Sequence, residues 1–114
     1  MASYGFMLPV LPGKEAVWKK RIAELNGPRR KDAIASRKRA GLTVERVWLQ
    51  KWPMGQYAVV YWEAKDIAKA SQSLLASKDP FDIWFLEKFL KEAHGLNPSR
   101  PVAPLNELVF GFKA

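Results

Sequence analysis

The sequence contains no cysteine among its 114 residues. This absence excludes a disulfide framework, a thiol nucleophile and a metal or iron–sulfur site with cysteine ligands. A chain that folds without disulfides suits a reducing compartment, so we expect a cytoplasmic protein. The sequence also lacks the run of about 18 apolar residues that a membrane-spanning helix needs. Its apolar N-terminus has no basic residues ahead of it and is broken by Pro9 and Pro12, so we do not expect a signal peptide.

Histidine is nearly absent, because His94 is the only one. There is no glycine-rich phosphate loop, no metal-ligand spacing and no nucleophile triad, so we expect no metal and no cofactor. His94 remains the only side chain whose unperturbed pKa lies near neutrality, which makes it the candidate catalytic residue for proton exchange. The alternative is a structural role, in which His94 and Gly95 simply end a helix.

Apolar residues make up 48% of the chain, enough for the core of a single domain spanning residues 1–114. The formal net charge is +8, and the basic residues concentrate between residues 14 and 39. Such a surface attracts anions, which include phosphates, nucleic acids and carboxylate ligands. The alternative is a solvated helix face with a basic bias.

Apolar periodicity divides the chain into strands and helices. Alternating apolar, β-branched and aromatic residues predict strands over 3–11, 43–52, 57–63 and 105–113. Helical spacing between turn and cap residues predicts helices over 14–26, 28–40, 66–76 and 79–95. With the helices grouped into two broken regions, the order is βαββαβ. This order predicts an α+β, ferredoxin-like fold in which helices cover one face of a four-stranded antiparallel sheet.

Both faces of the predicted sheet carry apolar side chains. In the segment 57–63, Tyr57, Val59 and Tyr61 alternate with Ala58, Val60 and Trp62. Helices on one side would leave the other apolar face in water, and large exposed apolar patches are rare on monomers. We therefore expect a homodimer that forms through the sheet face.

Three stretches carry a resemblance to a known superfamily: ELNGPRRKDAIASRKRAGLTVERVWLQ, GQYAVVYWE and SKDPFDIWFLEKFLKEAHG. They resemble the dimeric α/β-barrel superfamily, and most closely an uncharacterised bacterial family of small proteins with a DPFDxWF…HG stretch. The resemblance implies the ferredoxin-like fold and a dimer. It also implies a pocket between sheet and helices, as in the superfamily's cofactor-independent monooxygenases and small isomerases. It supplies no reaction, because fold alone does not set function.

The candidate substrate-binding residues fall into three groups. Arg30 and Arg37 are seven residues apart on one helix face and could clamp a carboxylate or phosphate, unless they are merely solvated. Trp84 and Phe85 could wall a flat apolar ligand, although core packing explains them as well. Three residues of the hairpin, with polar tips on an apolar sheet, could contact either a ligand or a dimer partner: Trp48, Gln50 and Tyr57.

The leading hypothesis is a small cytoplasmic homodimer with a pocket for an apolar or aromatic molecule that could be anionic. It could be a monooxygenase- or isomerase-like enzyme that needs no cofactor, or a binding protein without turnover. The alternative is an RNA-binding module, because the RNA-recognition fold has the same element order. We do not favour nucleic acid, because GQYAVVYW lacks the basic-Gly pair of that fold and has Val59 in place of an aromatic. A structural or regulatory dimer is a third possibility.

Overall fold

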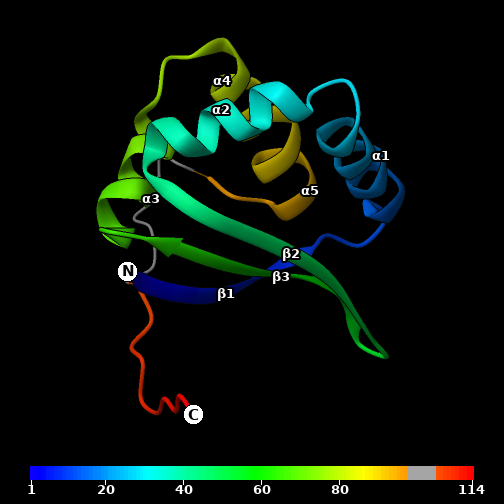
Figure 1. The fold of residues 1–114 in the computed structure, drawn as a ribbon. Coiled ribbons are helices and arrows are strands. Elements are labelled where there is room, and N and C mark those ends of the chain that lie inside the picture. The colour runs from blue at the N-terminus through cyan, green and yellow to red at the C-terminus, as the bar shows by residue number, and fades with distance from the viewer. Residues whose placement is uncertain (98–104) are drawn as a thin grey trace.

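The computed structural model describes residues 1–97 and 105–114. Three strands form one antiparallel sheet in the order β1-β3-β2 (Figure 1): β1 (Ala2–Val10), β2 (Leu42–Trp52) and β3 (Gly55–Ala64). A tight turn joins β2 to β3, so the predicted hairpin is confirmed. Gly55, which opens β3, has a φ of 151° that a residue with a Cβ rarely adopts.

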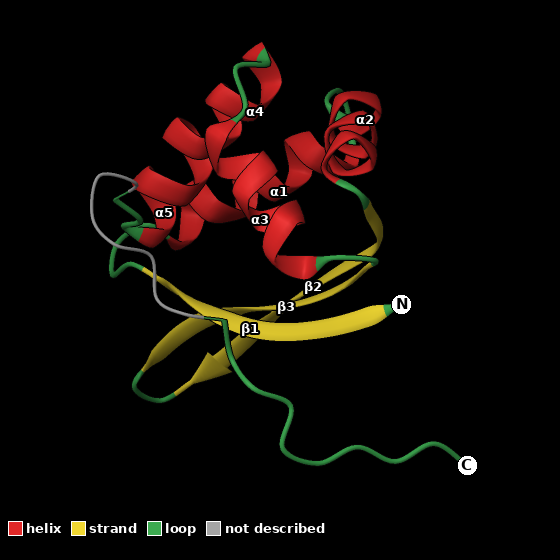
Figure 2. Ribbon diagram, turned by 90° about the vertical axis from the view of Figure 1, so that its left-hand side faces the viewer, coloured by secondary structure: helices red, strands yellow, loops and turns green. Residues whose placement is uncertain are grey.

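All helices lie on one side of this sheet (Figure 2). They are α1 (Glu15–Asn26), α2 (Arg30–Ala40), α3 (Ile67–Ala76), α4 (Pro80–Phe85), the π-helix η1 (Leu86–Lys91) and α5 (Glu92–His94). The last three follow one another directly and occupy the helix predicted over 79–95. Within the described part of the chain, no helix is long and apolar enough to cross a membrane.

Local signals explain where the helices of the second half begin and end. The Asp66 side chain accepts a hydrogen bond from the backbone N–H of Lys69 at 3.0 Å, and so caps α3. Asp79 does the same for the N–H of Phe81 at 2.9 Å, with Pro80 in the first turn of α4. Gly95 ends α5 in the left-handed conformation, at φ 71°.

The strand register separates two chemically different faces. Three rows of paired residues face the helices: Tyr4–Trp62–Glu45, Phe6–Val60–Val47 and Leu8–Ala58–Leu49. Three alternate rows form the open sheet face, which no helix of the described residues covers: Gly5–Tyr61–Arg46, Met7–Val59–Trp48 and Pro9–Tyr57–Gln50. The core forms where the first face meets the helices, in one cluster around Trp62 and another around Trp18 and Phe89.

The predicted four-stranded ferredoxin-like sheet is wrong, because residues 105–114 form no strand. The β1 edge, which a following strand would pair with, is instead contacted by a side chain: the Asn106 amide donates to the Gly5 carbonyl. After Asn106 the chain turns away from the edge (Figure 1). A strand needs a backbone partner to satisfy its N–H and C=O groups, and this segment pairs with no strand of the described residues. The fold is therefore α+β with a three-stranded antiparallel sheet.

Candidate functional site

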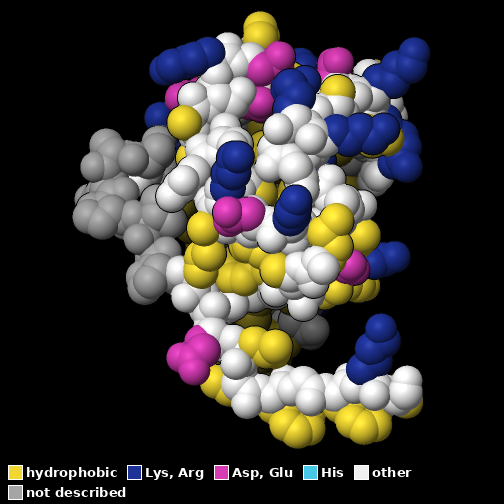
Figure 3. Space-filling view, turned by 60° about the vertical axis from the view of Figure 1, so that its left-hand side comes forward, with side chains coloured by type: hydrophobic (Ala, Val, Ile, Leu, Met, Phe, Trp, Pro, Cys, Tyr) yellow, Lys and Arg dark blue, Asp and Glu magenta, His cyan; other side chains and the backbone are white. Residues whose placement is uncertain are grey.

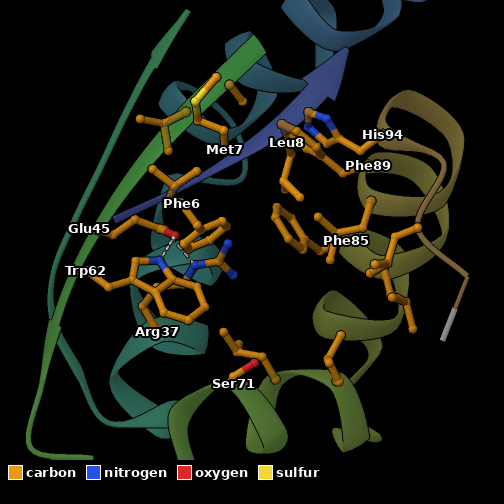
Figure 4. Close-up of a pocket in the computed structure, with 18 of the residues that line it drawn as sticks. Phe6, Met7, Leu8, Arg37, Glu45, Trp62, Ser71, Phe85, Phe89 and His94 are labelled. Atoms are coloured by element: carbon orange, nitrogen blue, oxygen red, sulfur yellow. Dashed lines mark hydrogen bonds and ion pairs between the residues drawn. The ribbon is translucent and has the colours of Figure 1, made fainter. Parts of the chain in front are cut away.

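A cavity of about 720 Å³ lies between the sheet and the helices (Figure 4). Its walls are mainly apolar and aromatic, as in most small-molecule sites. The strands contribute Phe6, Leu8, Val60 and Trp62, and the helices contribute Trp18, Ile22, Leu74, Phe85 and Phe89. The volume falls within the range of roughly 300–1,000 Å³ that is typical of ligand pockets.

One end of the cavity is polar and is built around the carboxylate of Glu45. The guanidinium Nε of Arg37 donates to Oε1 of Glu45 at 2.8 Å, and the indole nitrogen of Trp62 donates to Oε2 at 2.7 Å. Arg37 comes from α2, Glu45 from β2 and Trp62 from β3, so the network joins helix and sheet. The Arg37 side chain is only 11% exposed, which makes this a largely desolvated ion pair.

Arg37 retains capacity to bind a ligand. Its Nη1 donates to the Ser36 hydroxyl at 3.1 Å and its Nε to Glu45, while Nη2 has no hydrogen-bond partner among the described residues. Its guanidinium carbon lies 4.3 Å from the centre of the Phe85 ring, which places the charge over a ring of the cavity wall. Ser71, from α3, also lines the cavity (Figure 4). A carbonyl or carboxylate oxygen of a ligand would meet donors here.

His94 lies at the other end of the cavity and is buried. The indole nitrogen of Trp18 is 3.0 Å from its Nε2, and the Pro9 carbonyl oxygen is 2.7 Å from its Nδ1. An indole can only donate and a carbonyl can only accept, so Nε2 must be the bare nitrogen and Nδ1 must carry the proton. The ring is therefore a neutral imidazole with both nitrogens in use, and it stacks on Phe89 at a centroid distance of 5.7 Å.

Burial lowers the pKa of His94 below its usual value, and the hydrogen bond to Pro9 offsets this effect only in part. Protonation would also place an N–H on Nε2 opposite the N–H of Trp18. As a general base, His94 would thus have to break a buried hydrogen bond first. The catalytic role stays a prediction, and the geometry favours a structural one.

A fourth ionisable group, Asp82, borders the cavity from α4. Burial tends to raise the pKa of this carboxyl, but hydrogen bonds from Ser36, Ser77 and Arg39 outweigh burial and lower the pKa. Ser77 donates at 2.6 Å and Arg39 at 3.3 Å, and the Ser36 hydroxyl, itself fully buried in α2, also donates to it. Asp82 thereby ties α2 to α4 and has little capacity left for a ligand.

The structure brings together three of the eight site residues predicted from the sequence, because Arg37, Phe85 and His94 all line the cavity. Arg30 instead lines a second, shallower depression between α1, α2 and β2. Trp84 packs outside the cavity, under the guanidinium of Arg29 at 4.0 Å.

The other three predicted residues lie on the open sheet face, opposite the cavity: Trp48, Gln50 and Tyr57. Their roles as ligand contacts stay predictions, but they cannot contribute to this cavity from one chain. Trp48 is 52% exposed, which instead suits contact with a partner.

Sequence reasoning missed Glu45, Trp62, Trp18 and Ser71, which complete the two ends of the cavity. Glu45 and Trp62 could have been found, because their alternation places them on the strand face opposite Trp48 and Tyr57. What the alternation could not show was which face the helices would cover. Trp18 and Ser71 carried no signal beyond ordinary helix periodicity.

No family model, curated protein or solved structure matches the chain. The description of the site therefore depends on its own geometry. Among residues 1–97 and 105–114, no group of three or more His, Asp or Glu side chains is arranged to hold a metal ion.

Proposed function

We propose that this protein binds a flat apolar or aromatic small molecule carrying one polar acceptor group, and that it does so as a homodimer formed through the sheet face. The observation that carries the binding proposal is the combination of an aromatic-walled cavity with a desolvated guanidinium whose Nη2 has no partner among the described residues. The apolar part of the ligand would lie among Phe6, Trp62 and Phe85. Its acceptor, a carbonyl or carboxylate, would receive the Arg37 hydrogen bond.

Binding without turnover is the form that the geometry supports best. Glu45 has both carboxylate oxygens occupied, Asp82 receives three donors, and both nitrogens of His94 are bonded. A general base needs a free lone pair within reach of the substrate. A monooxygenase- or isomerase-like reaction, which the superfamily resemblance implies, would need His94 to give up a partner, or would have to use a carboxylate that already accepts two or three hydrogen bonds.

The dimer proposal is supported by the open sheet face. The row Met7–Val59–Trp48 runs across all three strands, and Met7 and Trp48 are each about half exposed. Cross-strand neighbours of this kind form a continuous apolar surface. A second copy, related by a two-fold axis, would pack the same face against it, and both apolar surfaces would be buried.

RNA binding is the second candidate, and the same face is the observation that favours it. Trp48, Tyr57 and Tyr61 could stack bases, and the net charge of +8 attracts phosphates. The fold weakens the case for RNA binding, because the βαββαβ order that suggested an RNA-recognition fold is not present. A dimer through this face would cover these aromatic side chains and so exclude RNA from them. A structural or regulatory dimer without a ligand would leave the cavity unused.

Titration with the fluorescent dye N-phenyl-1-naphthylamine tests the proposal. The dye should bind at one site per chain, and 2-naphthoate should displace it. Added single-stranded RNA should leave the titration unchanged. Absence of saturable dye binding, or displacement by RNA but not by 2-naphthoate, would contradict a small-molecule cavity.

A further inference from the structure

The last eight residues, 107–114, form an extended C-terminal arm that carries large apolar side chains into solvent. Four of them are exposed by 80% or more: Leu108 (80%), Val109 (86%), Phe110 (82%) and Phe112 (83%). Figure 3 shows this segment at the bottom of the view, where it projects away from the rest of the protein into solvent. At the base of the arm, the Asn106 amide donates a hydrogen bond to the Gly5 carbonyl.

The composition of the arm is not that of a solvated tail. Segments that stay disordered are poor in aromatic and β-branched residues, because they have too little apolar surface to bury. Here Leu108, Phe110 and Phe112 alternate with Val109 and Gly111, a pattern typical of chain that packs against a surface in extended form. The arm has such a sequence, but its large apolar side chains are left exposed among the residues that the structure describes.

The direction of the arm indicates where that surface lies. Figures 1 and 2 agree that the chain leaves the β1 edge on the side of the sheet opposite the helices. This is the side of the open sheet face, with its half-exposed Met7 and Trp48. A second copy packed on that face would therefore stand within the space into which the arm projects.

We propose that the C-terminal arm of each copy packs against the sheet layer of a second copy, so that two arms clasp the dimer reciprocally. This inference rests on the dimer proposed above and adds the element that holds it together. The arrangement is closed, since each copy gives one arm and receives one, and it leaves no arm free to recruit a third.

The area available is enough for a stable interface. A buried aromatic side chain removes roughly 150–250 Å² from water. Two arms contribute four phenylalanines, so these rings alone approach the threshold of about 1,000 Å² for a specific interface. The sheet faces add to this area.

Charge also favours a second copy over a lipid surface or a nucleic acid. Between residues 107 and 114 the only charged side chains are Glu107 and Lys113, so the arm is close to neutral. Segments that bind anionic membranes or nucleic acids carry clusters of Lys and Arg. Two copies at +8 each repel one another, and an apolar clasp is the kind of contact that could overcome this repulsion.

Deleting the arm is the first experiment. Light scattering over a concentration series compares the full chain with a chain that ends at Asn106. The full chain should have twice the mass of 13.0 kDa. Deletion, or the double change Phe110→Ser and Phe112→Ser, should raise the dimer dissociation constant at least 100-fold. Circular dichroism should not change, because the large apolar side chains of the arm are at least 80% exposed in the single chain.

The outcomes separate the arm from the rest of the proposal. If the deletion and the double substitution both leave the dimer dissociation constant unchanged, the proposed role of the arm is wrong and the sheet-face dimer is unaffected. A full chain that stays monomeric would overturn both, and co-sedimentation of that monomer with phosphatidylglycerol vesicles would identify a lipid surface as the occupant. Dye binding, measured on the same samples, reports the cavity separately.

The absence of native cysteine allows a second experiment that locates the contact. Chains with Phe112→Cys are mixed with chains that carry Met7→Cys or Trp48→Cys, and the mixture is oxidised gently. A disulfide between the two kinds of chain is the expected result. Chains with Lys20→Cys, on the exposed surface of α1, serve as the control and should not cross-link to Phe112→Cys. Equal cross-linking to Lys20→Cys would contradict the proposed placement.

Discussion

The indole nitrogen of Trp18 donates a hydrogen bond to Nε2 of His94, although 76 residues separate the two in the chain. With the bond from Nδ1 to the Pro9 carbonyl, the imidazole joins α1, α5 and the end of β1. Few side chains offer one donor and one acceptor on opposite sides of a flat ring that also stacks on a phenylalanine. This explains why the helical region ends on a histidine, and it closes one end of the cavity.

The Trp18→Phe variant tests this tie. It keeps the aromatic ring and removes the donor, so Nε2 of His94 stays buried without a partner. We expect a loss of about 1–3 kcal/mol in the free energy of unfolding, measured by urea denaturation. Trp84→Phe is the matched control, because the Trp84 indole nitrogen makes no hydrogen bond within the described residues. Equal losses in the two variants would mean that the bond contributes nothing.

The lowered pKa of His94 predicts a pH dependence of stability. The folded protein binds this proton less readily than the unfolded chain, whose histidine titrates near pH 6.5. Stability from the neutral ring is therefore complete above about pH 7 and declines as the pH falls below about 6.5, down to the folded pKa. Urea titrations between pH 7.5 and 5 should show this decline.

The His94→Asn variant is the control for that slope. Its free energy of unfolding should be lower at every pH, and it should no longer decline between pH 7 and 5 as it does in the unmodified protein. The lowered pKa of Asp82 acts only in more acidic solution, because its stabilisation is present above about pH 4. An unchanged slope in His94→Asn would assign the pH dependence to another group.

Ser36 and Asp82 support the helix layer that roofs the cavity. Removing the fully buried Ser36 hydroxyl takes one of three donors from the Asp82 carboxylate. We expect Ser36→Ala to lower the free energy of unfolding by about 1–3 kcal/mol. Ser73→Ala, on the exposed side of α3, should change it by no more than about 0.5 kcal/mol. If the two serines behave alike, the cluster does not stabilise the roof.

Arg37 should discriminate ligands by their polar group. In Arg37→Gln, the affinity for 2-naphthoate relative to naphthalene should fall by about tenfold or more, since a hydrogen bond to a charged group contributes about 1.5–3 kcal/mol. Calorimetric titration of both compounds gives the ratio. The ratio, rather than either affinity, is informative, because the variant also weakens the contact with Glu45. An unchanged ratio would place the polar end of the ligand elsewhere.

Local patterns predicted most of the elements. The helices at 14–26 and 28–40, the capped helix after Asp66 and the hairpin all follow from periodicity, caps and turns, which depend on near neighbours in sequence. The segment 105–113 has a genuine strand pattern, and the prediction was wrong because pairing needs a partner that the pattern cannot show. Periodicity shows on which face of a helix or strand a residue lies, but it does not show what covers that face.

The same limit explains the site. Arg37 and Phe85 could be proposed from chemistry alone, and both line the cavity. Trp48, Gln50 and Tyr57 had equally suitable chemistry, but they lie on the sheet face that the helices leave open. The hydrogen bond between Trp18 and His94 joins residues 76 positions apart, and no local signal predicts such a contact.

Filling the cavity from one position is the most direct test of small-molecule binding. Ser71 and Ser73 belong to the same helix, but Ser71 lines the cavity and Ser73 is exposed. Each serine is replaced by phenylalanine in a separate variant, and N-phenyl-1-naphthylamine is titrated into each folded variant. The cavity predicts that Ser71→Phe weakens dye binding at least tenfold while Ser73→Phe leaves it unchanged. Equal dye affinity in the two variants would contradict a ligand site between the sheet and the helices.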